Sequence, residues 1–239
     1  MTQAPLFYRS VAALNRETHA NTRIRTGPQA FGFAAGSHLV PAVFDEFPAA
    51  CRHLPIMFVS TGTVPAPVFL VGVQPGESNL VGPDGQWRGG YIPAFVRRYP
   101  FILGEVEGSD PVVCVDEASG LLDDRHGDAL FENGAETGLL RDKITLATEY
   151  AGAAKRTEAA SRLLAEMELL TSSTLNFTRG GTASAAIHGL LVVDEAKLGR
   201  LPDEQVLRLH REGLLAPIYA HLLSLGAIGT LGDLAQPLN

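Results

Sequence analysis

The 239-residue sequence lacks long apolar runs. No stretch approaches eighteen uninterrupted apolar residues, the length at which an apolar run becomes a candidate transmembrane helix, so we expect no membrane span. The opening residues MTQAPLFYRS contain neither the basic leader nor the apolar centre of a secretory signal,. We therefore expect a soluble, cytoplasmic protein, while export by a route without a signal stays open.

Cysteine and positive charge are also scarce. Cys51 and Cys114 are the only cysteines, they form no CxxC motif, and we expect two reduced thiols, with a disulfide left open,. The formal net charge of −7, without a run of lysine or arginine, argues against nucleic acid as a partner,.

Motifs that announce a reaction are missing as well. The sequence has no phosphate-binding GxxxxGK(S/T) loop, no dinucleotide-binding fingerprint, no nucleophile elbow and no HExxH metal pair,. The acidic segment 123–136 lacks the alternating oxygen ligands of a calcium-binding EF-hand,. The sequence therefore predicts no metal site and no cofactor.

The apolar runs that are present predict an α+β fold with a mainly antiparallel sheet. Short connections favour hairpins, because they leave no room for helical crossovers. A period of three to four residues predicts a long helix, and Pro202-Asp203 predicts the start of a helical C-terminus,. The expected hairpins pair Ile56–Ser60 with Pro67–Val73, Phe101–Val106 with Val112–Val115, and Thr171–Thr178 with Ser184–Val193; the expected helices are Leu139–Leu170, 203–212 and Leu214–Leu225.

Three further elements are predicted with less support from the pattern. Phe31–Ala35 has the pattern of a short strand, and Tyr91–Tyr99 that of a helix ended by Pro100,. Val40–Leu54 suits a helix with Glu46 on its solvated face, although Pro48 weakens that pattern,. We expect one domain over residues 1–239, with a subdivision near 120–138 as an alternative.

The stretch from Gln74 to Leu103 concentrates tryptophan, arginine, aromatic residues and glycine. Arg97 and Arg98 point in different directions on a helix, so one is expected to face solvent and the other to be held inside. An enclosed guanidinium requires an internal carboxylate, an array of carbonyl groups or an anionic ligand. Trp87, Tyr91 and Phe95 would line the wall of such an anion pocket.

Eight segments in order resemble the SapC family of bacterial proteins. They are LNRETHAN, VPAVFDEFP, LPIMF, NL–DG–W, YIPAFVRRYPF, CVDE, VVDEAKL and IYAHLLSLG, from Leu14 to Gly226. The chain departs from the pattern at Val81, where an aromatic residue is expected, and at Gly89-Gly90. The resemblance implies an association with surface-layer gene clusters and with genes for outer-membrane receptors, halogenase-like proteins and cupin-like hydroxylases. It implies no reaction that can be transferred, and the peptide-transport permease of the same name would need several membrane spans.

These observations favour an accessory or binding protein that recognises a protein partner or a small anionic ligand near Trp87–Tyr99. The candidate ligand-binding residues are Trp87, Tyr91, Arg97, Arg98, Tyr99, Asn79, His19 and His221. Two alternatives remain, a surface-layer component and an enzyme with an unmarked acid–base site. The candidates for that acid–base site are His19, Arg97, Arg98, Asp116, Glu117 and His221. The sequence does not predict the oligomeric state.

Overall fold

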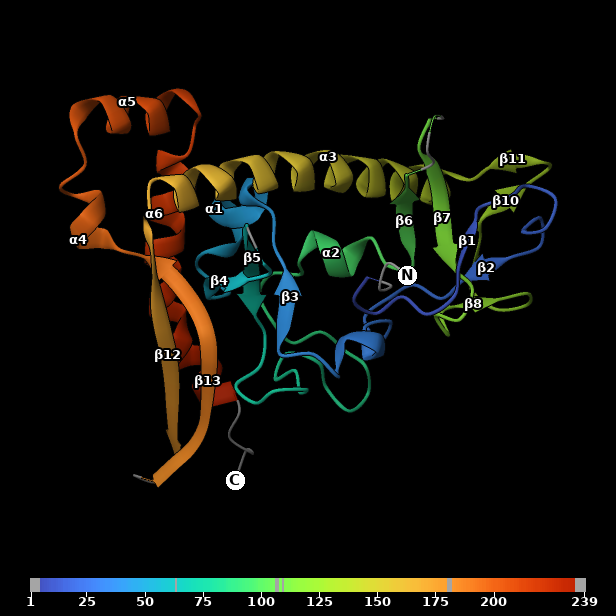
Figure 1. Ribbon diagram of the computed structural model, residues 1–239. Coiled ribbons are helices and arrows are strands. Elements are labelled where there is room, and N and C mark those ends of the chain that lie inside the picture. The colour runs from blue at the N-terminus through green and yellow to red at the C-terminus, as the bar shows by residue number, and fades with distance from the viewer. Residues whose placement is uncertain (1–4, 63, 106–107, 109, 180–181, 235–239) are drawn as a thin grey trace. The chain divides into compact units, whose positions relative to one another are not determined.

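The computed structural model describes residues 5–62, 64–105, 108, 110–179 and 182–234, and the chain in it forms two compact units (Figure 1). Unit 1 comprises Met1–Ala34, Val81–Trp87 and Ala94–Gly152, and unit 2 comprises Ala35–Leu80, Arg88–Pro93 and Ala153–Asn239. The chain passes between the units several times, and none of these passages falls within 120–138. A single domain stays a prediction, because one domain can contain two such units.

Unit 1 is built on short antiparallel strands. Its main sheet has the order β1-β7-β6, a second sheet has the order β8-β2-β9, and β10 pairs with β11. The elements are β1 (Val11–Ala13), β2 (Arg23–Ile24), η1 (Gly32–Ala34), α2 (Ala94–Arg97), β6 (Phe101–Gly104), β7 (Val112–Asp116), β8 (Leu122–Asp123), β9 (Asp128–Ala129), β10 (Phe131–Glu132), β11 (Ala135–Glu136) and the first half of α3 (Gly138–Glu166). The core packs Phe101 and Val115 of the main sheet against Ile24, Leu130 and Leu140.

Unit 2 contains one five-stranded antiparallel sheet of order β12-β13-β4-β5-β3. Its elements are β3 (Leu39–Pro41), η2 (Phe44–Glu46), α1 (Phe47–Ala50), β4 (Ile56–Ser60), β5 (Pro65–Leu70), the second half of α3, β12 (Leu170–Arg179), β13 (Thr182–Val193), α4 (Glu195–Leu198), α5 (Asp203–Arg211), α6 (Leu215–Ser224), η3 (Leu225–Ala227) and α7 (Ile228–Leu234). Phe44, Phe47, Phe58 and His221 form a chain of edge-to-face ring contacts inside it.

The α+β fold with an antiparallel sheet, a long helix and a helical C-terminus is confirmed. The three predicted hairpins form as β4–β5, β6–β7 and β12–β13. The Gly180-Gly181 turn predicted for the last of them lies outside the described residues. The long helix is α3, which Gly152 does not interrupt. Arg97 is exposed and Arg98 is buried, as their directions on a helix predict.

The turn at Pro83-Asp84-Gly85 illustrates why glycine stands where it does. The Gly85 N–H donates to the Gly82 carbonyl at 2.9 Å, and the Gly85 φ of +78° belongs to the left-handed region. A Cβ at this position would also lie 2.7 Å from the backbone oxygen of Gln29. Only glycine meets both conditions without strain.

Two predictions of local structure were wrong, those for Phe31–Ala35 and Val40–Leu54, and the short helix predicted over Tyr91–Tyr99 forms only in part. Phe31–Ala35 contains the 3-10 turn η1 rather than a strand, and Tyr91–Tyr99 contains only the one-turn helix α2. Val40–Leu54 divides into β3, η2 and α1, because Pro48 in the first turn of α1 cannot continue a helix from before it,. Glu46 is buried rather than solvated, and its Oε1 accepts a hydrogen bond from Tyr91 Oη at 2.8 Å.

Candidate functional site

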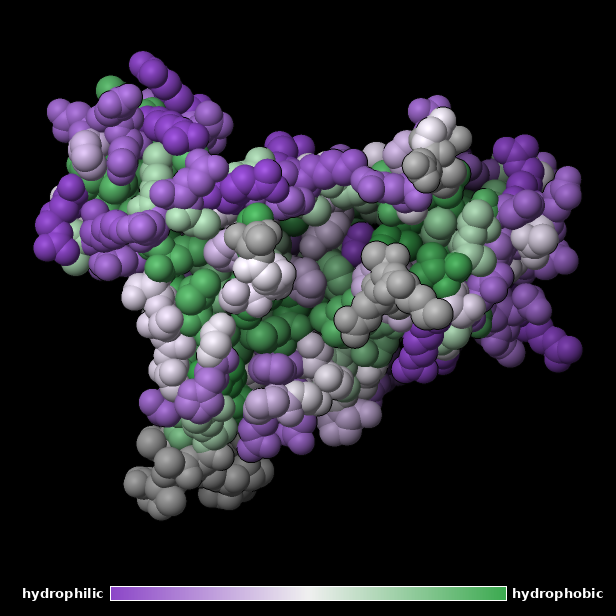
Figure 2. Space-filling model, in the orientation of Figure 1, coloured by the Kyte–Doolittle hydropathy of each residue, from purple (hydrophilic) through white to green (hydrophobic). Residues whose placement is uncertain are grey.

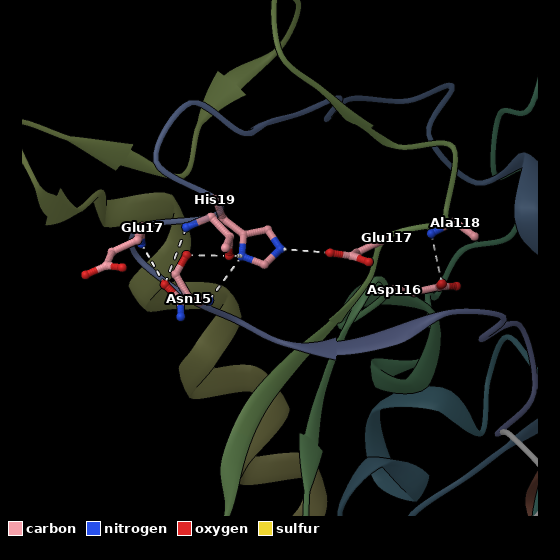
Figure 3. Close-up of polar contacts among 7 residues, drawn as sticks. Asn15, Glu17, His19, Asp116, Glu117 and Ala118 are labelled. Atoms are coloured by element: carbon pink, nitrogen blue, oxygen red, sulfur yellow. Dashed lines mark hydrogen bonds and ion pairs between the residues drawn. The ribbon is translucent and has the colours of Figure 1, made fainter.

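Asp116 and Glu117, at the end of β7, turn their carboxylates to different surroundings (Figure 3). Asp116 is 0% exposed and accepts hydrogen bonds from the backbone N–H groups of Arg9, Ser10 and Ala118 at 3.1, 2.8 and 3.1 Å. Tyr99 Oη adds a fourth at 3.0 Å. With four donors around it, Asp116 joins the N-terminal segment to the end of β7 and has no free position for a substrate.

The two tyrosines beside Asp116 are held in their neutral form. Burial raises the pKa of Tyr99, and the hydrogen bond that it donates to Asp116 raises it further. Burial also raises the pKa of Tyr8 to about 12, against the opposing effect of the Arg98 charge. Tyr8 Oη donates to the Phe101 carbonyl at 2.7 Å. Both hydroxyl groups therefore act as structural hydrogen-bond donors.

Arg98 is the buried arginine that the sequence predicts. It is 5% exposed, and its Cζ lies 4.3 Å from the ring centre of Tyr150, 4.6 Å from that of Phe95 and 5.7 Å from that of Tyr8. Its Nε has no hydrogen-bond partner, and no described carboxylate lies within ion-pair distance of its guanidinium. The internal ion pair considered from the sequence is thus absent among the described residues, and aromatic rings surround the cation instead.

His19 faces Glu117 across the mouth of a polar cavity (Figure 3). His19 Nδ1 lies 3.1 Å from the Asn15 backbone nitrogen, from the Asn15 carbonyl oxygen and from Thr18 Oγ1, so its own loop occupies this nitrogen. Nε2 lies 3.5 Å from Glu117 Oε1 and has no hydrogen-bond partner, although His19 is 5% exposed. The cavity measures about 650 Å³, and its other walls are Thr18, Thr22 and residues 122–126.

A second cavity of unit 1 carries two arginines. It measures about 390 Å³ and is lined by Arg9, Arg25, Thr26, Gln29, Ala30, Gly32, Phe33, Ser119, Gly120 and Leu121. The Arg25 guanidinium donates to the Gly120 carbonyl, which fixes it at the rim. Arg9 uses its backbone N–H for Asp116, and its side chain makes no hydrogen bond to any described residue. None of the described residues that line this cavity is acidic, and we call it the Arg9–Arg25 cavity.

Tyr99 stands directly behind the wall of the Arg9–Arg25 cavity. Its ring centre lies 4.1 Å from that of Phe33, a lining residue, and the Arg9 charge acts on the Tyr99 hydroxyl.

Of the other residues predicted for ligand binding in unit 1, Arg97 is exposed and its carbonyl accepts from Lys143 Nζ at 2.9 Å. Trp87 is buried and contacts Phe31 edge-on at 6.2 Å between ring centres.

The remaining predicted residues belong to unit 2 and hold its backbone. Asn79 Oδ1 accepts from the Val73 N–H at 2.8 Å. Tyr91 packs on Phe69 and donates to Glu46. His221 accepts from the Val193 N–H at Nε2, at 3.0 Å, and its Nδ1 lies 2.9 Å from the Ile56 carbonyl. These contacts give the three side chains a structural role.

The sequence reasoning missed Arg9 and Arg25, which lie in polar segments without any motif. The signal that could have found them is the TGPQAFG run after Arg25, whose glycines and proline predict a turning backbone against which a cavity can form,. Among the described residues, no group of three or more histidine, cysteine, aspartate or glutamate side chains is placed to hold a metal ion.

Comparison with known proteins gives one match. The family model SapC matches residues 14–231 of the 239-residue chain, which includes segments of both units, although Arg9 lies before the matched residues. No curated protein and no solved structure matches the chain. The match extends over more than nine-tenths of the chain, so the chain belongs to the SapC family.

Proposed function

We propose that this SapC-family chain is an accessory binding protein that takes a small carboxylate with an apolar body into the Arg9–Arg25 cavity. The observation that carries the proposal is the charge of the lining. Of the described residues that line the cavity, two are arginines and none is acidic, although the whole chain carries a net charge of −7. Because the overall field repels anions, a local cationic cavity is the place where an anion gains most.

The lining also suggests what accompanies the negative charge. Phe33, Leu121 and Ala30 supply apolar surface, while the Ser119 Oγ, which accepts from the Leu121 N–H, keeps its own proton for a ligand oxygen. Arginine forks match carboxylates in bidentate geometry. A cavity near 390 Å³ lies in the range of small-molecule sites, roughly 300–1,000 Å³,.

The test is calorimetric titration with benzoate as the probe and inorganic phosphate as the compact anion for comparison. Arg9→Gln is expected to weaken benzoate binding about 10- to 100-fold, because a charge-assisted hydrogen bond contributes about 1.5–3 kcal/mol. The backbone N–H of Arg9 donates to Asp116, and its side chain makes no hydrogen bond to any described residue, so we expect this variant to keep the fold.

Arg16→Gln provides the matched control, since it removes an equally exposed charge of unit 1 outside the cavity. This variant should bind benzoate as the unmodified chain does. The proposal is contradicted by equal weakening in both variants, which would indicate only a general charge effect, or by the absence of benzoate binding. Phosphate binding without benzoate binding would leave an anion site but contradict the apolar body.

A second candidate function rests on the buried His19 Nε2, which faces the half-exposed Glu117 without a hydrogen bond. In this reading Glu117 is the acid–base group and His19 is the positioning residue behind it, because His19 Nδ1 is occupied by its own loop. Against a panel of chromogenic esters and glycosides, Glu117→Gln should lower turnover about 100-fold or more, and Glu149→Gln should not. If no panel member turns over above the buffer rate, the acid–base reading fails.

A further inference from the structure

The C-terminal helices present a surface without charge. From Gly213 to Gly232 there is no aspartate, glutamate, lysine or arginine, in a chain of which 19% of the residues are charged. Ala216, Tyr219, Leu223 and Gly226 recur at spacings of three and four, so they share one exposed face, which we call the α6 stripe,. Tyr219 is 55% and Leu223 is 74% exposed, the two largest values among the exposed large apolar residues.

The opposite face of α6 is fastened to the sheet of unit 2. His221 contacts the backbone of Val193 and Ile56, and Ser224 Oγ accepts from the Ile56 N–H at 2.9 Å and donates to the His221 carbonyl at 2.6 Å. Figure 1 shows α6 alongside the β12–β13 hairpin. In Figure 2 that hairpin carries mostly pale surface, whereas α5 is strongly hydrophilic. The α6 stripe is therefore the outer face of a fixed helix.

A lipid bilayer and a second protein both suit an apolar helix face. By length and composition Leu215–Asp233 could cross a membrane, and 28% of it is buried. However, the buried His221 and Ser224 would lose their backbone partners if the helix left unit 2. A helix lying in the membrane interface relies on lysine and arginine along its polar edge, and the α6–α7 segment has none,. The net charge of −7 adds repulsion from anionic lipid.

We infer that the α6 stripe pairs with the same stripe of a second copy of this chain. Two copies with a net charge of −7 each repel one another, and this segment lets them meet without opposing like charges,. An antiparallel arrangement about a two-fold axis between Leu222 and Leu223 sets the large Tyr219 opposite Gly226 of the other copy. One surface then complements itself, as an isologous dimer requires.

The experiment is sedimentation velocity on the full chain over about 1–100 µM. The unmodified chain is expected to sediment as a dimer. Leu223→Glu is expected to sediment as a monomer, with a dissociation constant raised at least 100-fold, because the interface would bury one unpaired carboxylate from each copy. Leu207→Glu is the matched control, since Leu207 is a 50% exposed leucine on α5, outside the stripe, and this variant should stay dimeric.

Two results would overturn the inference. One is a monomeric unmodified chain throughout the concentration range. The other is a stripe-dependent association with lipid, in which monomeric protein co-sediments with phosphatidylcholine–phosphatidylglycerol vesicles and Leu223→Glu does not. A cooperative urea transition of Leu223→Glu, together with a circular dichroism spectrum equal to that of the unmodified chain, would show that the variant is folded, so that loss of the dimer reports on the surface.

Discussion

Asp116→Ala is expected to lower the free energy of unfolding by about 3–5 kcal/mol. The substitution removes a fully buried carboxylate and leaves three backbone N–H groups and the Tyr99 hydroxyl without their acceptor. Each unsatisfied buried donor costs about 1–3 kcal/mol, and the values are not additive because the Arg9–Ser10 segment can move toward water.

Urea unfolding followed by circular dichroism measures this effect as a lower transition midpoint. The midpoint of Asp116→Asn should lie between those of the unmodified chain and Asp116→Ala, because the single carbonyl oxygen of the amide can still accept from Ser10 and Ala118. Asp124→Ala removes an exposed carboxylate eight residues along the chain and should change the stability by less than about 0.5 kcal/mol,. A midpoint for Asp116→Ala equal to that of Asp124→Ala would contradict the structural role assigned to Asp116.

The sequence placed Asp116 and Glu117 together as an acidic strand end and could not separate their roles. Alternation along a strand says that neighbours point to opposite faces, but it does not say which face is covered. The covering group here is the Arg9–Ser10 backbone, which is more than a hundred residues away in the chain. Long-range backbone donors leave no trace in the pattern of one strand, so the buried member of the pair could not be chosen in advance.

The elements predicted well are those whose pattern is long or whose connection is short. The α3 helix repeats its apolar residues over several turns, and the hairpins are joined by only a few residues,. The short elements between Phe31 and Leu54 failed for the opposite reason. There each apolar run is three to five residues long, and contacts within the folded unit decide between a turn, a strand and a helix,.

The candidate site was predicted in part. Two arginines with opposite directions followed from the helical spacing, and the burial of Arg98 bears this out. Of the partners expected for a buried guanidinium, an internal carboxylate is absent among the described residues, and three aromatic rings surround Arg98. Arg9 and Arg25 were missed, since an exposed arginine becomes part of a site only through neighbours brought in by the fold.

The largest pH effect is expected from His221. Burial lowers its pKa from the ordinary 6.5 to about 4, because charging the ring inside unit 2 costs its hydration,. Its Nε2 must also stay unprotonated to accept from the Val193 N–H. Below pH 6.5 the unfolded chain therefore binds a proton that the folded chain refuses, so His221 makes the folded state less stable as the pH falls.

The sign and size follow from this difference in proton binding. The contribution of His221 is fully present above about pH 6.5 and is lost as the pH falls toward 4, by about 3 kcal/mol in total,. The measurement is the difference in unfolding free energy between the unmodified chain and His221→Gln, from urea titrations at pH 7.5 and 4.5. This difference should shrink by about 2–3 kcal/mol on acidification. Ser224→Ala, a non-titrating change beside the same ring, should show a constant difference. If the difference in unfolding free energy between the unmodified chain and His221→Gln were also the same at both pH values, burial would not hold the imidazole neutral. That result would contradict the lowered pKa assigned to His221.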